Sequence, residues 1–112
     1  MTEQEFLEKY AEKISALRLS DFKPLIGDAF SYGDAAGKRH LLALSSVEEG
    51  RHNRDLFESF TLTFTSSREI FFPQGHYLLS QEKTGEFPLF LVPVASLDPQ
   101  RNAYCAYFNR KL

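Results

Sequence analysis

The sequence has no tryptophan, one methionine and one cysteine, and it contains no long apolar run. Because Cys105 is alone, an intramolecular disulfide is excluded. The longest apolar stretch, residues 87–97, is about eleven residues long and is interrupted by Pro88 and Pro93. A membrane-spanning helix needs roughly 20 apolar residues, so none is expected. The first twenty residues also carry too many glutamates for a secretory signal peptide. We therefore expect a soluble, cytoplasmic protein without a membrane partner.

An excess of charge of one sign is also missing. Thirteen basic residues and fifteen acidic residues give a formal net charge of −2. Domains that bind nucleic acid usually carry a strong basic excess. The most basic short segment, residues 51–54, is flanked by acidic residues that cancel most of its field. We therefore expect no nucleic-acid partner.

Motifs that carry chemistry are scarce. The spacing of His40, His52 and His76 matches no structural zinc pattern, and a single cysteine removes the cysteine-pair classes. The chain has neither a phosphate-binding glycine loop nor a strained serine turn. Cys105 falls within a predicted strand, where we expect an inert core cysteine rather than an activated nucleophile. We therefore assign no catalytic residue, metal or cofactor, and expect a protein that is not an enzyme.

The first eighteen residues predict a helix. Thr2 and Glu5 have the spacing of a capping box, in which each side chain binds a backbone N–H group of the first turn. Apolar residues then recur at intervals of three and four between residues 6 and 17, which gives one apolar stripe. We expect a single domain over residues 1–112, with this helix at residues 1–18 and a β-rich part at residues 19–112.

From Ala29 onward the apolar period changes from 3.6 to 2, which predicts strands. Six strands are predicted, at residues 29–32, 38–47, 60–65, 76–80, 89–94 and 104–109. Turn residues between them suit an antiparallel meander. We expect positive φ at Gly27, which ends a short helical turn before the first strand, and at Gly75 and Gly85 in the turns between strands. The strand at residues 89–94 is apolar on both sides, so we expect it to be covered on both faces. Its region also contains Pro88 and Pro93, which favour an edge position or a bulge.

These patterns predict a mainly β (α+β) fold. The expected architecture is a small antiparallel β-barrel or sandwich of about six strands, with the N-terminal helix packed on it.

Several of these segments, taken together, resemble a known family of small bacterial domains of unknown function. The resemblance covers residues 19–109 and is most specific in two elements, Gln74-Gly75-x-Tyr77 and Phe90-Leu91-Val92-Pro93-Val94. It implies a short β-rich protein, sometimes encoded beside phage-tail-collar-like surface proteins. It brings no catalytic residue, cofactor or substrate.

Eleven phenylalanines and five tyrosines are more aromatic residues than one small core is expected to use. Aromatic clusters that remain exposed mark protein interfaces. The candidates for such an interaction surface are Phe57, Phe71, Phe72, Tyr32, Tyr77 and Tyr107.

We therefore expect a non-enzymatic protein-interaction or assembly module that binds an unidentified protein partner or forms a homo-oligomer. The resemblance adds an accessory role in a phage-tail-like or surface-associated assembly. The alternative is a small-ligand-binding β-barrel, whose open end would present Arg39, His40 and His76 as polar groups. An enzyme of unknown class comes third.

Overall fold

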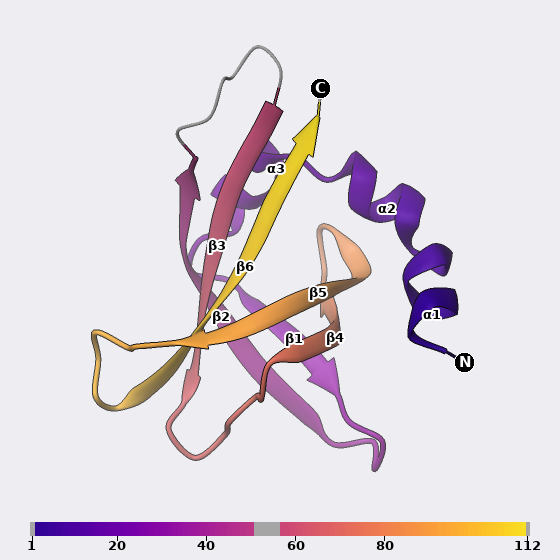
Figure 1. The fold of residues 1–112 in the computed structure, drawn as a ribbon. Coiled ribbons are helices and arrows are strands. Elements are labelled where there is room, and N and C mark those ends of the chain that lie inside the picture. The colour runs from indigo at the N-terminus through magenta and orange to yellow at the C-terminus, as the bar shows by residue number, and fades with distance from the viewer. Residues whose placement is uncertain (1, 51–56, 112) are drawn as a thin grey trace.

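The protein is a closed six-stranded antiparallel β-barrel preceded by short helices (Figure 1). This computed structural model describes residues 2–50 and 57–111. The helical segments are α1 (Glu3–Lys9), α2 (Ala11–Ala16), α3 (Leu19–Phe22) and the 3-10 turn η1 (Lys23–Leu25). The strands are β1 (Ala29–Gly33), β2 (Arg39–Glu49), β3 (Phe57–Ser67), β4 (Gly75–Gln81), β5 (Gly85–Val94) and β6 (Arg101–Lys111). The predicted fold class is confirmed, and the barrel, not the sandwich, is the architecture.

The single N-terminal helix that we predicted is broken in two. Thr2 caps α1 as expected, since its Oγ1 atom accepts a hydrogen bond from the backbone N–H of Glu5 at 3.2 Å. The break lies at Tyr10, whose φ of −107° and ψ of 7° are not helical. Two like-charge pairs, Glu8 with Glu12 and Lys9 with Lys13, straddle Tyr10, and such pairs weaken a continuous helix.

The strand order differs from the meander that the turns predicted. Neighbouring strands follow the closed order β1-β2-β3-β6-β5-β4. Two three-stranded meanders, β1–β3 and β4–β6, are joined by pairing of β3 with β6 and of β1 with β4. The predicted meander was wrong at β3 and β4, which are consecutive in the chain but do not pair with each other in the sheet. Turn chemistry specifies hairpins between successive strands, and it carries no information on pairing between strands distant in sequence.

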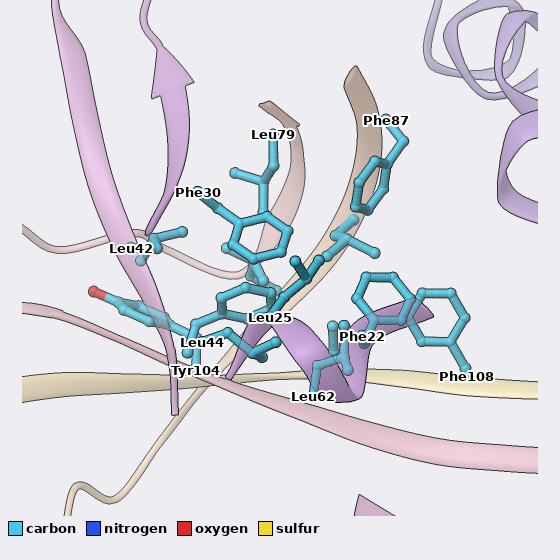
Figure 2. Packing of buried hydrophobic residues seen from close by; sticks show 14 of the residues in the cluster. Phe22, Leu25, Phe30, Leu42, Leu44, Leu62, Leu79, Phe87, Tyr104 and Phe108 are labelled. Carbon is cyan, nitrogen blue, oxygen red and sulfur yellow. The ribbon is translucent and has the colours of Figure 1, made fainter. Parts of the chain in front are cut away.

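Side chains fill the interior of the barrel (Figure 2). Phe60, Leu62 and Phe64 of β3 point inward and are fully or almost fully buried, as their alternation predicted. Phe22 of α3 and Leu25 of η1 enter from one end and are also buried. The barrel is therefore a packed core, which is usual for a barrel with so few strands.

The two prolines of β5 lie where the strand is paired on one side. Residues 85–91 pair with β4, whereas residues 92–94 pair with β6. Pro88 is opposite Leu78 of β4 and Pro93 is opposite Tyr104 of β6, so each has a side of the strand without a ladder. This local edge tolerates a residue without an N–H group. The expectation that β5 is covered on both faces was wrong, because Phe90 is 41% exposed.

Gly27 adopts a positive φ of 94°, and Gly75, which we expected to do so, does not. A Cβ atom at Gly27 would meet nothing within 4 Å, so a Gly27→Ala change tests backbone conformation alone. We expect it to lower the free energy of unfolding by about 1 kcal/mol, because left-handed backbone is costly for any residue with a Cβ atom. Chemical denaturation measures the loss. Gly75→Ala is the matched control and should cause no loss; equal effects at the two glycines would contradict this account.

Candidate functional site

The barrel opens between β5 and β6. Across the described residues, the ladder between these strands is limited to Val92–Val94 with Ala103–Cys105. Beyond this point β6 pairs with β3 and β5 pairs with β4. Figure 1 shows the two strands diverging from the turn that connects them, with α1 and α2 at the open side. The divergence leaves β5 and β6 unpaired with each other on the side of the barrel that α1 and α2 face.

A cleft of about 770 Å³ lies between the N-terminal helices and the diverging strands. Most of its lining is apolar. Its apolar residues are Leu7, Ala11 and Ile14 from the helices, and Pro88, Leu89, Phe90, Ala106 and Phe108 from the strands. Its polar and charged residues are Ser15, Arg18, His76, Tyr107, Asn109 and Arg110. None of the described residues of α2 is buried, although Ile14 packs against the barrel core.

Hydrogen bonds to β5 and to β6 hold the helices beside the cleft. The Tyr10 hydroxyl donates to Oε1 of Glu86 on β5 at 3.0 Å. Partial burial, together with this hydrogen bond to a carboxylate, raises the pKa of Tyr10. The guanidinium group of Arg110 on β6 donates to the backbone carbonyl oxygens of Ile14 and Ser15. Arg110 lines the cleft, whereas Tyr10 and Glu86 are not among its lining residues.

Glu58 organises the charged end of the cleft. Its carboxylate accepts hydrogen bonds from the Arg18 guanidinium group and from the backbone N–H of Leu19, both at 2.9 Å. Burial raises the pKa of Glu58, but these two hydrogen bonds and the charges of Arg110 and Arg18 outweigh burial and lower the pKa overall. Glu58 thus forms an ion pair with Arg18 and is influenced by the charge of Arg110, and of these three side chains only the two arginines line the cleft.

The lowered pKa of Glu58 gives stability that depends on pH. A carboxyl group whose pKa is lower in the folded state stabilises the fold above its unfolded pKa, and this stability is lost as the pH falls through its folded pKa. A Glu58→Gln variant should therefore unfold about 1 kcal/mol more easily than the parent at pH 7, since the site is partly exposed. The difference should shrink as the solution is acidified below pH 4. Denaturation across this pH range measures it, and a difference that stays constant with pH would contradict the assignment.

The predicted aromatic surface is not a single surface. Phe72 is 3% exposed and belongs to the core, so its place among the exposed residues was wrong. Tyr32 and Tyr77 are half-buried and pack edge-to-face on Phe72, with ring centroids 5.8 and 5.1 Å from it. Phe71 and Tyr107 are exposed, and Tyr107 alone of this set lines the cleft. The side chain of Phe57 lies outside the described residues.

The polar residues proposed for the open end of the barrel occupy separate environments. His40 Nε2 lies 3.0 Å from Oδ2 of Asp34, and this hydrogen bond is the main reason that the pKa of Asp34 is lowered. Arg39 donates to the hydroxyl of Ser31 at 3.1 Å. His76 instead contacts the ring of Phe90, with centroids 4.8 Å apart, and lines the cleft. Because side chains fill the barrel, its interior is not the place where these three groups would meet a ligand.

Metal-ligating residues do not gather in the part of the chain that the structure describes, where no group of three such side chains is found. His52 lies outside the described residues. Cys105 is half-buried on the outer face of β6 rather than in the core, with Sγ 3.6 Å from the hydroxyl of Thr63. The neighbouring Tyr107 has a raised pKa, chiefly because of Cys105. The expectation of a core cysteine was wrong because side chains alternate along a strand, and Tyr104 and Ala106, on each side of Cys105, take the inward positions.

Most cleft residues were absent from the sequence-based candidates. The missed apolar residues are Leu7, Ala11, Ile14, Pro88 and Phe90, and the missed cations are Arg18 and Arg110. Two sequence signals were available for the apolar part. One is the apolar stripe of residues 6–17, and the other is the apolar character of residues 89–94 on both sides. Both were interpreted as surfaces that pack on the domain. Leu17 is indeed buried in the core and Ile14 packs against it, whereas Leu7 and Ala11 face the cleft.

Comparisons with known proteins give a family and no function. The family model described as "Domain of unknown function (DUF6916)" matches residues 17–108. This confirms the resemblance to a family of unknown function, over nearly the residues on which it was based. No curated protein and no solved structure matches the chain. None of the helices in the described residues is long and apolar enough to cross a membrane.

Proposed function

Because the chain belongs to the DUF6916 family, to which no function is assigned, we propose its function from the cleft alone. The domain is a non-enzymatic binding module that holds a small apolar ligand between α1–α2 and the open side of β5 and β6. The observation that carries this proposal is the apolar cleft of about 770 Å³ beside a filled barrel. The ligand-binding alternative from the sequence is thus moved from the inside of the barrel to its side.

The size and the walls of the cleft support this proposal. Small-molecule sites in proteins have volumes of about 300–1,000 Å³ and are mostly apolar with a few polar groups. Here apolar side chains from the helices face apolar side chains from the strands across the cleft. Each Å² of apolar surface left in water costs about 25 cal/mol, so a ligand that covers both walls gains free energy from each.

The titratable groups of the cleft favour binding over catalysis. They are Arg18, His76, Tyr107 and Arg110, and among the described residues no carboxylate or thiol lines the cleft. General acid–base or nucleophilic catalysis would ordinarily pair His76 with such a group. We therefore keep the expectation of a protein that is not an enzyme as part of this proposal.

Binding of linear alcohols of increasing chain length tests the proposed function. Titration calorimetry with octanol and decanol should give one ligand per chain, with affinity rising roughly fourfold per methylene, because each buried methylene contributes about 0.8 kcal/mol. Ala11→Trp places a large side chain in the cleft and should abolish binding. Ala16→Trp is the matched control, since Ala16 is an exposed α2 residue that does not line the cleft. No saturable binding, or equal effects of the two tryptophans, would contradict the proposal.

A protein partner is the second candidate, and the open strands favour it. Phe90 and Tyr107 are 41% and 63% exposed and lie on the two strands that diverge. Strand edges without a ladder can accept a further strand from another chain. Light scattering after size-exclusion chromatography tests the homo-oligomer. A dimer that becomes a monomer in the Phe90→Ser/Tyr107→Ser double variant would support this candidate, and a parent protein that is already a monomer would contradict its homo-oligomeric form.

The cellular location and the assembly role of the protein are proposed from its sequence alone. The accessory role in a phage-tail-like or surface-associated assembly depends on the family resemblance. The cytoplasmic location is proposed because the lone Cys105 suits a reducing compartment.

A further inference from the structure

We propose that the ligand of the cleft is a monocarboxylate with an alkyl chain, bound with its carboxylate group at the Arg18–Arg110 end. This inference rests on the proposed function, because it names the class of ligand for the same cleft. It is argued from the two arginines that line the cleft and from the hydrogen-bond donors that they carry.

The charged arginine side chains that line the cleft are both cationic. Within the described residues, Arg18 and Arg110 line it and no carboxylate does. The carboxylates nearest to Arg18 lie outside this lining: Glu58 forms an ion pair with its guanidinium group, and Asp21 accepts a hydrogen bond from its backbone N–H. An anionic group on the ligand is therefore favoured next to the two arginines.

Arg18 and Arg110 also have donors of the required geometry. A guanidinium group has five N–H donors, and a planar carboxylate accepts two of them in parallel. Within the described residues, Arg110 uses donors on its two terminal nitrogens for the carbonyl oxygens of Ile14 and Ser15. Arg18 uses one for Glu58. The other N–H donors of these two groups favour a planar anion such as a carboxylate, because the planar guanidinium group matches it better than an ammonium group does.

The rest of the cleft suits an alkyl chain. Beyond the arginines, the helix wall presents Ile14, Ala11 and Leu7 in order along α2 and α1. The opposite wall presents Leu89 and Phe90 of β5. An unbranched chain that extends from the arginines toward Leu7 would contact both walls, and it would make no demand for hydrogen bonds in the apolar part.

A comparison of dodecanoate with dodecanol tests this inference, because the two share one chain and differ in the head group. By titration calorimetry at pH 7.5 and low salt, dodecanoate should bind about five- to tenfold more tightly than dodecanol, as expected for a partly exposed charge pair. Arg110→Gln should bring this affinity ratio close to one. Glu58→Gln should raise the ratio, because it removes the carboxylate that now neutralises one arginine.

Arg68→Gln is the matched control, since it makes the same change of charge at an exposed residue that does not line the cleft. It should leave the ratio unchanged. Each variant is first checked for cooperative unfolding, and Glu58→Gln provides an independent test if Arg110→Gln does not fold. Equal affinities for dodecanoate and dodecanol would overturn the inference and leave the proposed function intact. Absence of binding by both ligands would overturn the proposed function as well, and an equal effect of Arg68→Gln would show a non-specific charge effect and overturn the inference.

Discussion

Replacement of Phe22 by alanine should lower the free energy of unfolding by about 3–5 kcal/mol, the range expected for removal of a buried aromatic ring. Phe22 is fully buried at one end of the barrel (Figure 2). Its ring centroid lies 5.9 Å from that of Phe60, 6.0 Å from that of Phe87 and 5.6 Å from that of Phe108. The substitution would leave a cavity among three strands that the rigid sheet cannot close.

Urea denaturation of the Phe22→Ala variant measures this loss. Ile26→Ala is the control, because Ile26 follows the same helical segment and is 48% exposed. It should cost less than about 1 kcal/mol. If Phe22→Ala had as small an effect as Ile26→Ala, α3 would not close the barrel, and the interior would be open to ligands after all.

Removal of the Tyr104 hydroxyl should have the second largest effect, about 2 kcal/mol. This buried hydroxyl accepts a hydrogen bond from the backbone N–H of Phe72 at 3.1 Å and lies 3.0 Å from the hydroxyl of Ser66. It also donates to the carbonyl oxygen of Ile70 at 3.3 Å. Tyr104→Phe leaves the Phe72 N–H buried without this acceptor, and a buried group in that state costs about 1–3 kcal/mol.

Thermal and urea denaturation of Tyr104→Phe test this prediction. Tyr77→Phe provides the control, because the Tyr77 hydroxyl donates to the Pro73 carbonyl oxygen at an exposed position where water can replace it. Its loss should be well below 1 kcal/mol. Similar losses in the two variants would mean that the Tyr104 network does not hold the segment of Phe71 and Phe72 on the barrel.

The strands were predictable from the sequence because their signal is local. Alternation of Phe60, Leu62 and Phe64 with threonines follows directly from the geometry of one strand with one buried face. Gly27 and Gly85 were also identified correctly as positions of positive φ, since turn chemistry depends on a few adjacent residues. The expectation of a positive φ at Gly75 was wrong, because Gly75 begins β4 in ordinary extended backbone.

The closure of the barrel and the cleft depend on relations between distant residues. Pairing of Glu58 with Arg110 joins β3 to β6, and no local pattern specifies it. The same pairing brings Arg110 to the end of α2, so the cationic end of the cleft arises from residues 14, 18, 58 and 110 together. The break at Tyr10 contributes as well, because a single straight helix would follow a different path across the opening.

The aromatic surface illustrates the same limit. Phe71 and Phe72 are adjacent in an irregular segment, where alternation does not say which side chain points inward. The Tyr104 hydroxyl binds the backbone N–H of Phe72 and orients this residue into the core, whereas Phe71 stays 61% exposed. Tyr104, 32 positions away in the chain, therefore determines that Phe72 and not Phe71 is buried.

The central claim is that the binding site lies beside the barrel and not inside it. The most direct test is a titration of isotope-labelled protein with dodecanoate, followed by amide chemical shifts. We expect saturable changes in Ala11, Ile14, Phe90, Tyr107 and Arg110, with little change in Tyr32 and His40 at the β1–β2 hairpin. Changes centred on Tyr32 and His40, or on the interior residues Phe30 and Leu42, would contradict it.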